Sequence, residues 1–265
     1  MFIDSHCHLD RLKLDKYENG LGDALEAAAQ EQVSEMLCVA IDLEHIDQVL
    51  SIAANNANVY ASVGVHPTSY EGEEPTVDRL VTLADEPNVI AIGETGLDYF
   101  YSAEHKELQQ QRFIRHLEAS KITGKPVIVH TRDAKEDTLR IIEAHGDKDV
   151  AGVLHCFTED LDMALRAIEL GYYISFSGIV TFKNAVELQE VARSIPLERM
   201  LIETDSPYLA PVPFRGKPNE PKYVGKVAEF IAKLRETDVE TIAQATAANF
   251  HTLFSHARLV REARK

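Results

Sequence analysis

The sequence predicts an α/β fold in which one (β/α)₈ TIM barrel spans residues 1–265 as a single domain. Short apolar runs alternate with segments of helical periodicity along the whole chain. No linker, low-complexity tract or internal repeat marks a domain boundary. Alternation of this kind predicts a parallel sheet covered by helices, and eight such runs suit a closed barrel. A doubly wound open sheet is the alternative.

Eight apolar runs have the length expected of buried parallel strands. They lie near residues 1–5, 35–41, 59–65, 89–93, 126–129, 150–154, 172–176 and 200–204. Between them, apolar residues recur at the spacing of one helical face, which predicts helices that pack against the sheet. Examples are Ile46, Val49, Leu50 and Ala53 after the second run, and Phe113, Ile114 and Leu117 after the fourth.

The chain is strongly acidic, with a formal charge of −16 from 27 basic and 43 acidic residues. This argues against broad electrostatic adhesion to nucleic acid but leaves room for a local phosphate site. No apolar stretch approaches the roughly 20 residues of a membrane-spanning helix, and three cysteines are too few for a disulfide framework. We therefore expect a cytoplasmic protein with no membrane attachment and no obligatory protein partner. Cys7 and Cys156 are interpreted as buried structural thiols that face away from the site described next.

Metal-binding residue types follow the predicted strands at their carboxyl ends. His6 and His8 follow the first strand, and alternation places both imidazoles on one face. Glu94, His130, His155 and Asp205 follow the fourth, fifth, sixth and eighth strands in the same way. Because the loops at these strand ends build the active face of a barrel, we expect the six side chains to converge there.

Four histidines and two carboxylates exceed what one tetrahedral ion needs, and they suit two divalent ions that share a carboxylate. Glu94 is the predicted bridge, because its side chain is longer than that of Asp and its strand lies between the others. The expected ligand sets are His6, His8, Glu94 and Asp205 for one ion, and Glu94, His130 and His155 for the other. Mg²⁺, Mn²⁺ and Zn²⁺ are all candidates, since such ligands tolerate several metals.

Two acidic residues lie one layer deeper on the same faces as predicted ligands. Alternation places Asp4 beneath His6 and Glu203 beneath Asp205. Ligand histidines commonly donate their second N–H to a carboxylate, so both acids are expected to support ligands. A partly hydrated polar layer is the alternative.

Two metal ions and a shared water predict hydrolysis, because the ions activate water at neutral pH. Asp205 and Glu94 are the predicted catalytic residues. One oxygen of Asp205 is expected to bind metal while the other accepts a proton from the attacking water. No Gly-x-Ser-x-Gly elbow, P-loop or Rossmann glycine pattern adjoins a strand, which argues against other mechanisms.

Four residues near the predicted centre are candidates for substrate binding. Arg132 can hold a phosphate with its planar donors, and Arg215 lies in the proline-rich stretch after the eighth strand. Tyr99 opens an aromatic cluster after Glu94 that can stack on a base, and His66 follows the third strand. The alternatives are solvated arginines, aromatic rings packed beneath a loop, and a histidine that caps its strand.

Six motifs span nearly the whole chain: DSHCHLD at 4–10, GVHP at 64–67, GETGLDY at 93–99, PVIVHTR at 126–132, HCF at 155–157 and ETDSP at 203–207. In these motifs the chain resembles the TatD-type deoxyribonucleases, which are metal-dependent hydrolases with an amidohydrolase-like barrel. It looks closest to a bacterial branch of uncharacterised metal-dependent hydrolases. The resemblance implies the same six metal ligands, and it implies hydrolysis of DNA phosphodiester bonds with 3′ to 5′ exonuclease activity.

DNA ends, or another phosphoester, are therefore the expected substrates, with a preference for frayed or single-stranded termini because the surface is acidic. A small-molecule amide, lactone or phosphoester hydrolase on the same barrel is the main alternative. Many such enzymes bridge their metals with a carboxylated lysine, where this chain has Glu94, which favours the nuclease. A non-catalytic metal-binding scaffold is the third possibility, and the complete ligand set argues against it.

Overall fold

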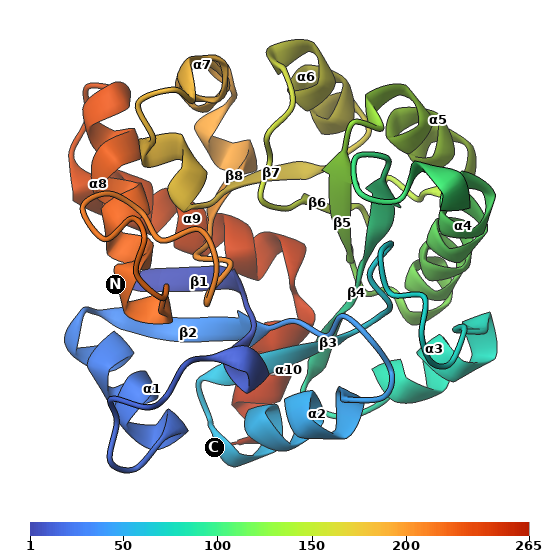
Figure 1. Ribbon diagram of the computed structural model, residues 1–265, viewed down its shortest axis with the longest axis horizontal. Helices are drawn as coiled ribbons and strands as arrows, with labels where there is room; N and C mark the ends of the chain where they lie inside the picture. Colours follow the sequence, from blue (N-terminus) through green and yellow to red (C-terminus); the bar gives the residue numbers. More distant parts are fainter. Residues whose placement is uncertain (265) are drawn as a thin grey trace.

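Eight parallel strands form one sheet in sequence order in the computed structural model, which describes residues 1–264 (Figure 1). The strands are β1 (Phe2–Cys7), β2 (Val33–Cys38), β3 (Val59–Val63), β4 (Val89–Asp98), β5 (Val127–Arg132), β6 (Gly152–Leu154), β7 (Tyr173–Phe176) and β8 (Met200–Ile202). The seam between β8 and β1 is bridged by hydrogen bonds from Asp205 N–H to His6 O and from the Ser5 hydroxyl to Ile202 O, each 2.9 Å. The prediction of a (β/α)₈ barrel is confirmed, and the doubly wound alternative is wrong.

Helices cover the outside of the barrel between successive strands (Figure 1). They are α1 (Leu21–Gln30), α2 (Ile46–Asn55), α3 (Val77–Ala84), α4 (Lys106–Thr123), α5 (Lys135–His145), α6 (Leu161–Glu169), α7 (Val186–Ser194) and α8 (Val224–Leu234), followed by α9 (Val239–Leu253) and α10 (His256–Ala263). Short 3₁₀ turns occur at Leu9–Arg11, Ala103–His105, Gly178–Thr181, Leu197–Arg199 and Pro221–Tyr223. Within residues 1–264, no helix is both long and apolar enough to cross a bilayer.

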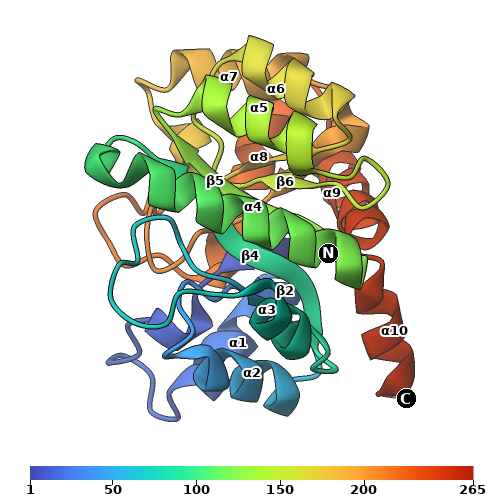
Figure 2. The same cartoon turned by 90° about the vertical axis from the view of Figure 1, so that its right-hand side faces the viewer.

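The apolar core has two layers, one between the sheet and its helices and one inside the barrel. Inner-layer side chains such as Ile90, Ile128 and Leu201 pack together with Phe250 and Phe254 from the C-terminal helical segment. Figure 2 shows α9 and α10 together on one side of the barrel. Apolar side chains fill the barrel near the amino ends of the strands. The polar residues of the strands therefore lie at the carboxyl ends, where active sites of such barrels are found.

Strand β4 continues five residues beyond the apolar run that predicted it and ends at Asp98. The side chains of Glu94 and Asp98 face the barrel mouth, while the ladder to β5 continues through the pair Asp98 and Arg132. The register between β4 and β5 shifts between Ile92 and Thr95. This bulge inserts one extra residue into β4 beside Glu94. Bulges of this kind change the direction in which a side chain points.

Two glycines make the bulge possible. Gly93 and Gly96 have φ of 133° and 124°, a region that side chains rarely occupy. A Cβ at Gly96 would overlap the carbonyl oxygen of His130, so β4 and β5 approach too closely for any larger residue. Glu94 therefore lies within the strand and not at its end.

Candidate metal centre

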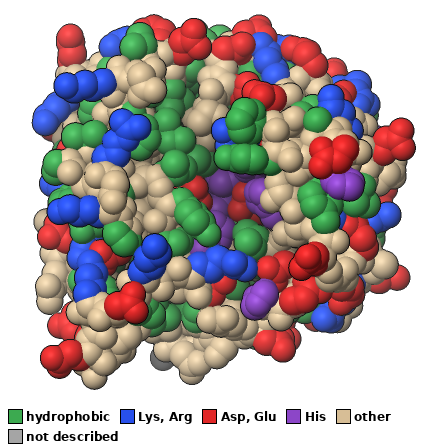
Figure 3. All heavy atoms as spheres, in the orientation of Figure 1, with side chains coloured by type: hydrophobic (Ala, Val, Ile, Leu, Met, Phe, Trp, Pro, Cys, Tyr) green, Lys and Arg blue, Asp and Glu red, His purple; other side chains and the backbone are tan. Residues whose placement is uncertain are grey.

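The six predicted ligands meet at the mouth of the barrel, where the strands end. His6, His8, Glu94 and His155 are almost fully buried, and Asp205 lies beside them on the loop after β8. Figure 3 shows histidine and acidic side chains gathered at the bottom of a hollow in this face. Buried histidines and carboxylates at such density are expected only where they bind one another or a cation.

One group of predicted ligand atoms lies beside Oε2 of Glu94. His6 Nε2 lies 3.4 Å from Glu94 Oε2 and 3.4 Å from His8 Nε2. His8 Nε2 also lies 3.4 Å from Asp205 Oδ1, and His6 Nε2 lies 3.8 Å from the same oxygen. These four residues are the set predicted for the first ion.

A second group surrounds the other oxygen of Glu94. Glu94 Oε1 lies 2.7 Å from His155 Nε2 and 3.4 Å from His130 Nδ1, the two histidines predicted for the second ion. His66 joins them, with Nε2 at 3.3 Å from the same oxygen. His66, Glu94 and His130 are close enough to hold an ion together. His66, which was predicted to contact substrate, is therefore also positioned as a possible metal ligand.

The charge of the site suits a bound cation. Burial by itself would raise the pKa of Glu94, but His155 and His66 hold that pKa well below its usual range. Burial would likewise lower the pKa of His155, yet Glu94 and Glu203 raise it well above its ordinary value. Buried acids thus favour positive charge at His155, and a divalent ion held by neutral imidazole ligands would supply that charge.

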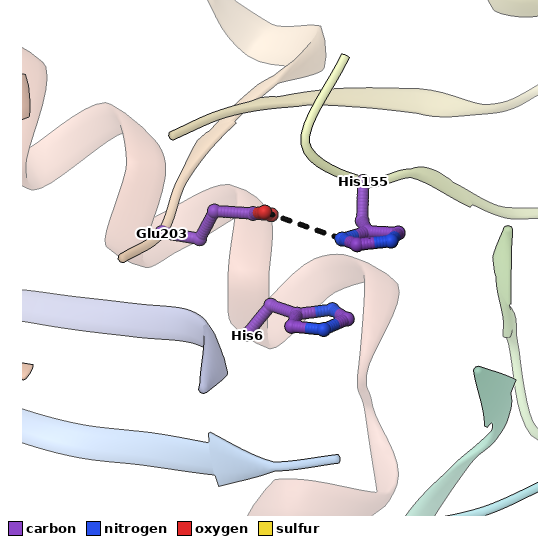
Figure 4. Close-up of side chains that lie close together, drawn as sticks. All are labelled: His6, His155 and Glu203. Atoms are coloured by element: carbon purple, nitrogen blue, oxygen red, sulfur yellow. Dashed lines mark hydrogen bonds and ion pairs between the residues drawn. The ribbon is translucent and has the colours of Figure 1, made fainter. Parts of the chain in front are cut away.

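Glu203 lies where it was predicted to support a ligand, although the ligand is His155. Its Oε1 is 3.3 Å from His155 Nδ1 and accepts the backbone N–H of Cys156 at 2.9 Å. Figure 4 shows this contact, with the ring of His6 parallel to that of His155 at a centroid distance of 3.9 Å. Because Glu203 contacts Nδ1 of His155, the other ring nitrogen, Nε2, faces Glu94.

Asp4 does not support the His6 ring, contrary to the prediction. Its carboxylate accepts the backbone N–H of Thr204 at 2.9 Å and contacts the Thr204 hydroxyl, and burial raises the pKa of Asp4 to about 8. The β1–β2 register shifts between Asp4 and Cys7, so simple alternation fails there. Asp4 instead joins the strand β1 to the segment after β8.

Asp98 is a supporting residue that the sequence analysis missed. Its Oδ2 lies 3.2 Å from His130 Nε2, and its Oδ1 accepts the backbone N–H of Tyr101 at 2.8 Å. Asp98 is four residues beyond Glu94, and alternation along a longer β4 would have placed both on one face. The apolar run ended too early to reveal this.

The substrate predictions divide into two groups. Arg132 and His66 line a cavity of about 530 Å³ at the mouth of the barrel, within the usual range for ligand pockets. Tyr99 does not line it, and its hydroxyl donates instead to Asp137 on α5 at 2.8 Å. Arg215 is also outside the cavity, over the ring of Phe182. Neither Tyr99 nor Arg215 lines the cavity, and their role in substrate binding stays a prediction.

Cys156 lines the same cavity, although it was expected to face away. The reason is that β6 ends at Leu154, so strand alternation no longer applies, and Cys156 has a φ of 41°. Its thiol lies 3.2 Å from the Ser177 hydroxyl, and burial holds its pKa well above the usual value. A protonated thiol is a poor nucleophile, so Cys156 forms part of the cavity wall. Cys7, by contrast, is fully buried and donates to Leu37 O, as a structural thiol should.

A parallel (β/α)₈ barrel with clustered histidines and carboxylates at its mouth defines the class of metal-dependent barrel hydrolases. The family model described as TatD related DNase matches residues 3–255. The chain is 49% identical to the uncharacterized metal-dependent hydrolase YcfH of Escherichia coli K12 over 252 residues, covering 95% of each chain. The uncharacterized metal-dependent hydrolase BU355 of Buchnera aphidicola is 41% identical over 96% of this chain and 98% of its own.

The crystal structure of YjjV, a TatD homolog from Escherichia coli K12, has the same fold, with a TM-score of 0.88 at 31% identity. The match covers 96% of this chain and 98% of YjjV. The chain therefore belongs to the TatD related DNase family. Its relatives are described as metal-dependent hydrolases, so a non-catalytic scaffold is not supported.

Proposed function

We propose that the protein hydrolyses phosphodiester bonds of DNA from the 3′ end, using two divalent ions. The observation that carries this proposal is the position of Glu94, whose two carboxylate oxygens each face a separate group of histidines. A shared carboxylate between two ligand sets is the arrangement of two-metal hydrolases of phosphate esters. The description of the family model supports DNA as the polymer.

The ions would be held by His6, His8, Glu94 and Asp205 on one side and by Glu94, His130 and His155 on the other. When bound, such ions activate water and stabilise negative charge on the phosphate. Asp205 Oδ1 faces His8, and its other oxygen accepts the proton of the attacking water and returns it to the leaving oxygen. The surrounding imidazoles keep the pKa of Asp205 below its usual value despite burial, so it is ionised and able to accept.

The shape and charge of the molecule favour the end of a single strand. The cavity of about 530 Å³ admits only a few groups of a chain, and the net charge of −16 disfavours long contacts with duplex phosphates. A terminus requires few phosphate contacts. We therefore expect faster release from single-stranded or frayed ends than from blunt duplexes.

The test uses purified protein whose metal content is measured by elemental analysis. Single-stranded and duplex oligonucleotides carrying a label at the 5′ end are incubated with Mg²⁺, Mn²⁺ or Zn²⁺. A ladder that shortens from the 3′ end is expected, and Glu94→Gln should lower the rate at least about 100-fold with loss of bound metal. Glu86→Gln, an exposed position outside the site, is the matched control. Protein that contains metal yet releases no nucleotide from any substrate would contradict the proposal.

Hydrolysis of a small phosphoester or lactone is a second candidate, because apolar side chains also line the cavity. They are Ile41, Ile179 and Leu209, together with the ring of Tyr208. An apolar lining suits a compact ligand as well as a base. A panel of such esters assayed beside DNA distinguishes the two, since the preferred substrate has the higher kcat/KM.

A further inference from the structure

Arg132 is unusual among the arginines of this protein because its guanidinium is not engaged. Within residues 1–264 it makes no side-chain hydrogen bond or ion pair, although acidic residues outnumber basic ones by 43 to 27. Apart from Arg215, each of the other arginines donates a hydrogen bond to a carboxylate or carbonyl oxygen or, in the case of Arg79, forms an ion pair with a carboxylate. Of the two exceptions, only Arg132 lines the cavity.

Two exposed aromatic rings hold this guanidinium. It lies 4.1 Å from the ring centre of Phe100 and 4.6 Å from that of Tyr101. The two rings are perpendicular, and they are 56% and 66% exposed, so they contribute little to the core. Cation–π contacts fix the orientation of a guanidinium and leave its N–H donors free. The pair of rings therefore presents Arg132 to a ligand.

The same turn links Arg132 to the metal centre. Asp98 accepts the backbone N–H of Tyr101 with one oxygen and contacts His130 with the other. Arg132 follows His130 by two residues on β5, which is roughly 7 Å further toward the mouth of the barrel. The guanidinium itself lies against Phe100 and Tyr101 at the carboxyl end of β5, so we expect an anion bound there to be separate from a phosphate held between the ligand groups.

We propose that Arg132, with Phe100 and Tyr101, forms a second anion subsite, which binds a phosphate adjacent to the one that is cleaved. This inference rests on the proposed phosphodiester hydrolysis and specifies its substrate as a chain end carrying at least two phosphates. A guanidinium without an acidic partner gains charge-assisted hydrogen bonds with such a phosphate. A substrate with a single phosphodiester leaves the subsite empty.

Three dinucleotides test the subsite: dTpdT, the same compound with a 5′-phosphate, and the same compound with a 3′-phosphate. All three contain one scissile bond. One of the phosphorylated forms should have a kcat/KM about tenfold or more above dTpdT, and its identity shows on which side the subsite lies. Arg132→Gln should remove this preference, so that the three compounds have similar kcat/KM values in the variant. Equal rates for the three compounds in the wild-type protein, or a preference that persists in Arg132→Gln, would overturn the inference.

Two further variants separate the subsite from general damage. Phe100→Ala combined with Tyr101→Ala should raise KM for the preferred dinucleotide while kcat stays the same, because the rings only orient Arg132. Arg140→Gln, at an exposed arginine paired with Asp137 on α5, is the matched control and should keep the preference.

Binding is measured separately from turnover. In the Glu94→Gln background, calorimetry should show tighter binding of one phosphorylated dinucleotide than of dTpdT, and the difference should vanish with Arg132→Gln. If no dinucleotide is cleaved by metal-loaded protein but this difference is present, the subsite stands and the proposed hydrolysis fails. If cleavage occurs without the difference, the subsite fails.

Discussion

His130 donates its Nε2 hydrogen to Asp98 Oδ2 across 3.2 Å, which leaves Nδ1 of the same ring free to act as a ligand 3.4 Å from Glu94 Oε1. The carboxylate can only accept, so the bond selects one tautomer of the imidazole. Asp98 is 1% exposed and also anchors the turn that contains Tyr101. One buried acid thus orients a ligand and shapes the loop beside it.

Replacing Asp98 with Ala should weaken binding of the ion held by His130 about 10- to 100-fold, because the ring loses its fixed tautomer and orientation. The ion held by His6 and His8 should be retained. Metal titration followed by elemental analysis measures both sites. Asp78→Ala on the exposed side of α3 serves as the control. Equal loss of both ions would show that Asp98 acts on the whole fold and not on His130.

Gln109 of α4 supports the same turn from below and is fully buried. Its side-chain oxygen accepts the Asp98 N–H at 2.8 Å, and its two amide hydrogens are shared among Asp98 O, Ser102 O and the Tyr70 hydroxyl. Gln109→Leu leaves these groups without partners and should cost about 3 kcal/mol of unfolding free energy. Urea denaturation measures the loss. Gln111→Leu, at an exposed position on the same helix, should change stability by less than about 0.5 kcal/mol.

Gly96 should tolerate no side chain. Ala at this position would overlap His130 O and force an unfavourable φ, so Gly96→Ala should lower Tm by several degrees and weaken metal binding through His130. Gly22→Ala is the matched control, because a Cβ there meets nothing within 4 Å and the residue lies in α1. That variant should be neutral or slightly stabilising. A Gly96→Ala protein with unchanged Tm and metal content would contradict the close approach of β4 and β5.

His116 should make the protein less stable in mild acid. Burial lowers its pKa to about 4, and the neutral ring donates from Nδ1 to Arg112 O while Nε2 accepts the Val65 N–H. Its pKa is about 6.5 in the unfolded chain, so the unfolded state binds the proton first. Stability is therefore unaffected above pH 6.5 and is lost as the pH falls from 6.5 to 4, by about 3 kcal/mol in total.

Comparison with His116→Gln isolates this contribution, because the other titrating groups are common to both proteins. Unfolding free energies measured at pH 7.5, 6, 5 and 4 should show the wild-type protein losing about 3 kcal/mol relative to the variant. A constant difference across this range would mean that His116 is not held neutral.

The helix α4 illustrates what periodicity could and could not predict. Phe113 and Leu117 are buried as their spacing predicted, but Ile114 is only partly buried. Much of the buried face is polar and includes Gln109, Arg112 and His116. Buried polar residues are stable there because they bind backbone groups of the loops after β3 and β4. The spacing of apolar residues cannot predict that a polar helix face is buried, when that face is stabilised by hydrogen bonds to backbone atoms.

The sequence by itself determined the number and order of the strands and the convergence of His6, His8, His130, His155 and Asp205. These follow from local rules, since apolar runs form strands and the residues after parallel strands meet at one end of a barrel. Only the tertiary structure determined the direction of the Glu94 side chain, which depends on the bulge in β4 where it pairs with β5. The contact of Asp98 with His130 likewise depends on the tertiary structure. The tertiary structure also decided that Arg132 lines the cavity without an acidic partner while the Tyr99 hydroxyl bonds Asp137 on α5. Each of these features depends on a neighbouring strand or helix that is distant in the sequence. A local sequence pattern does not show which atoms of that neighbour will lie nearby.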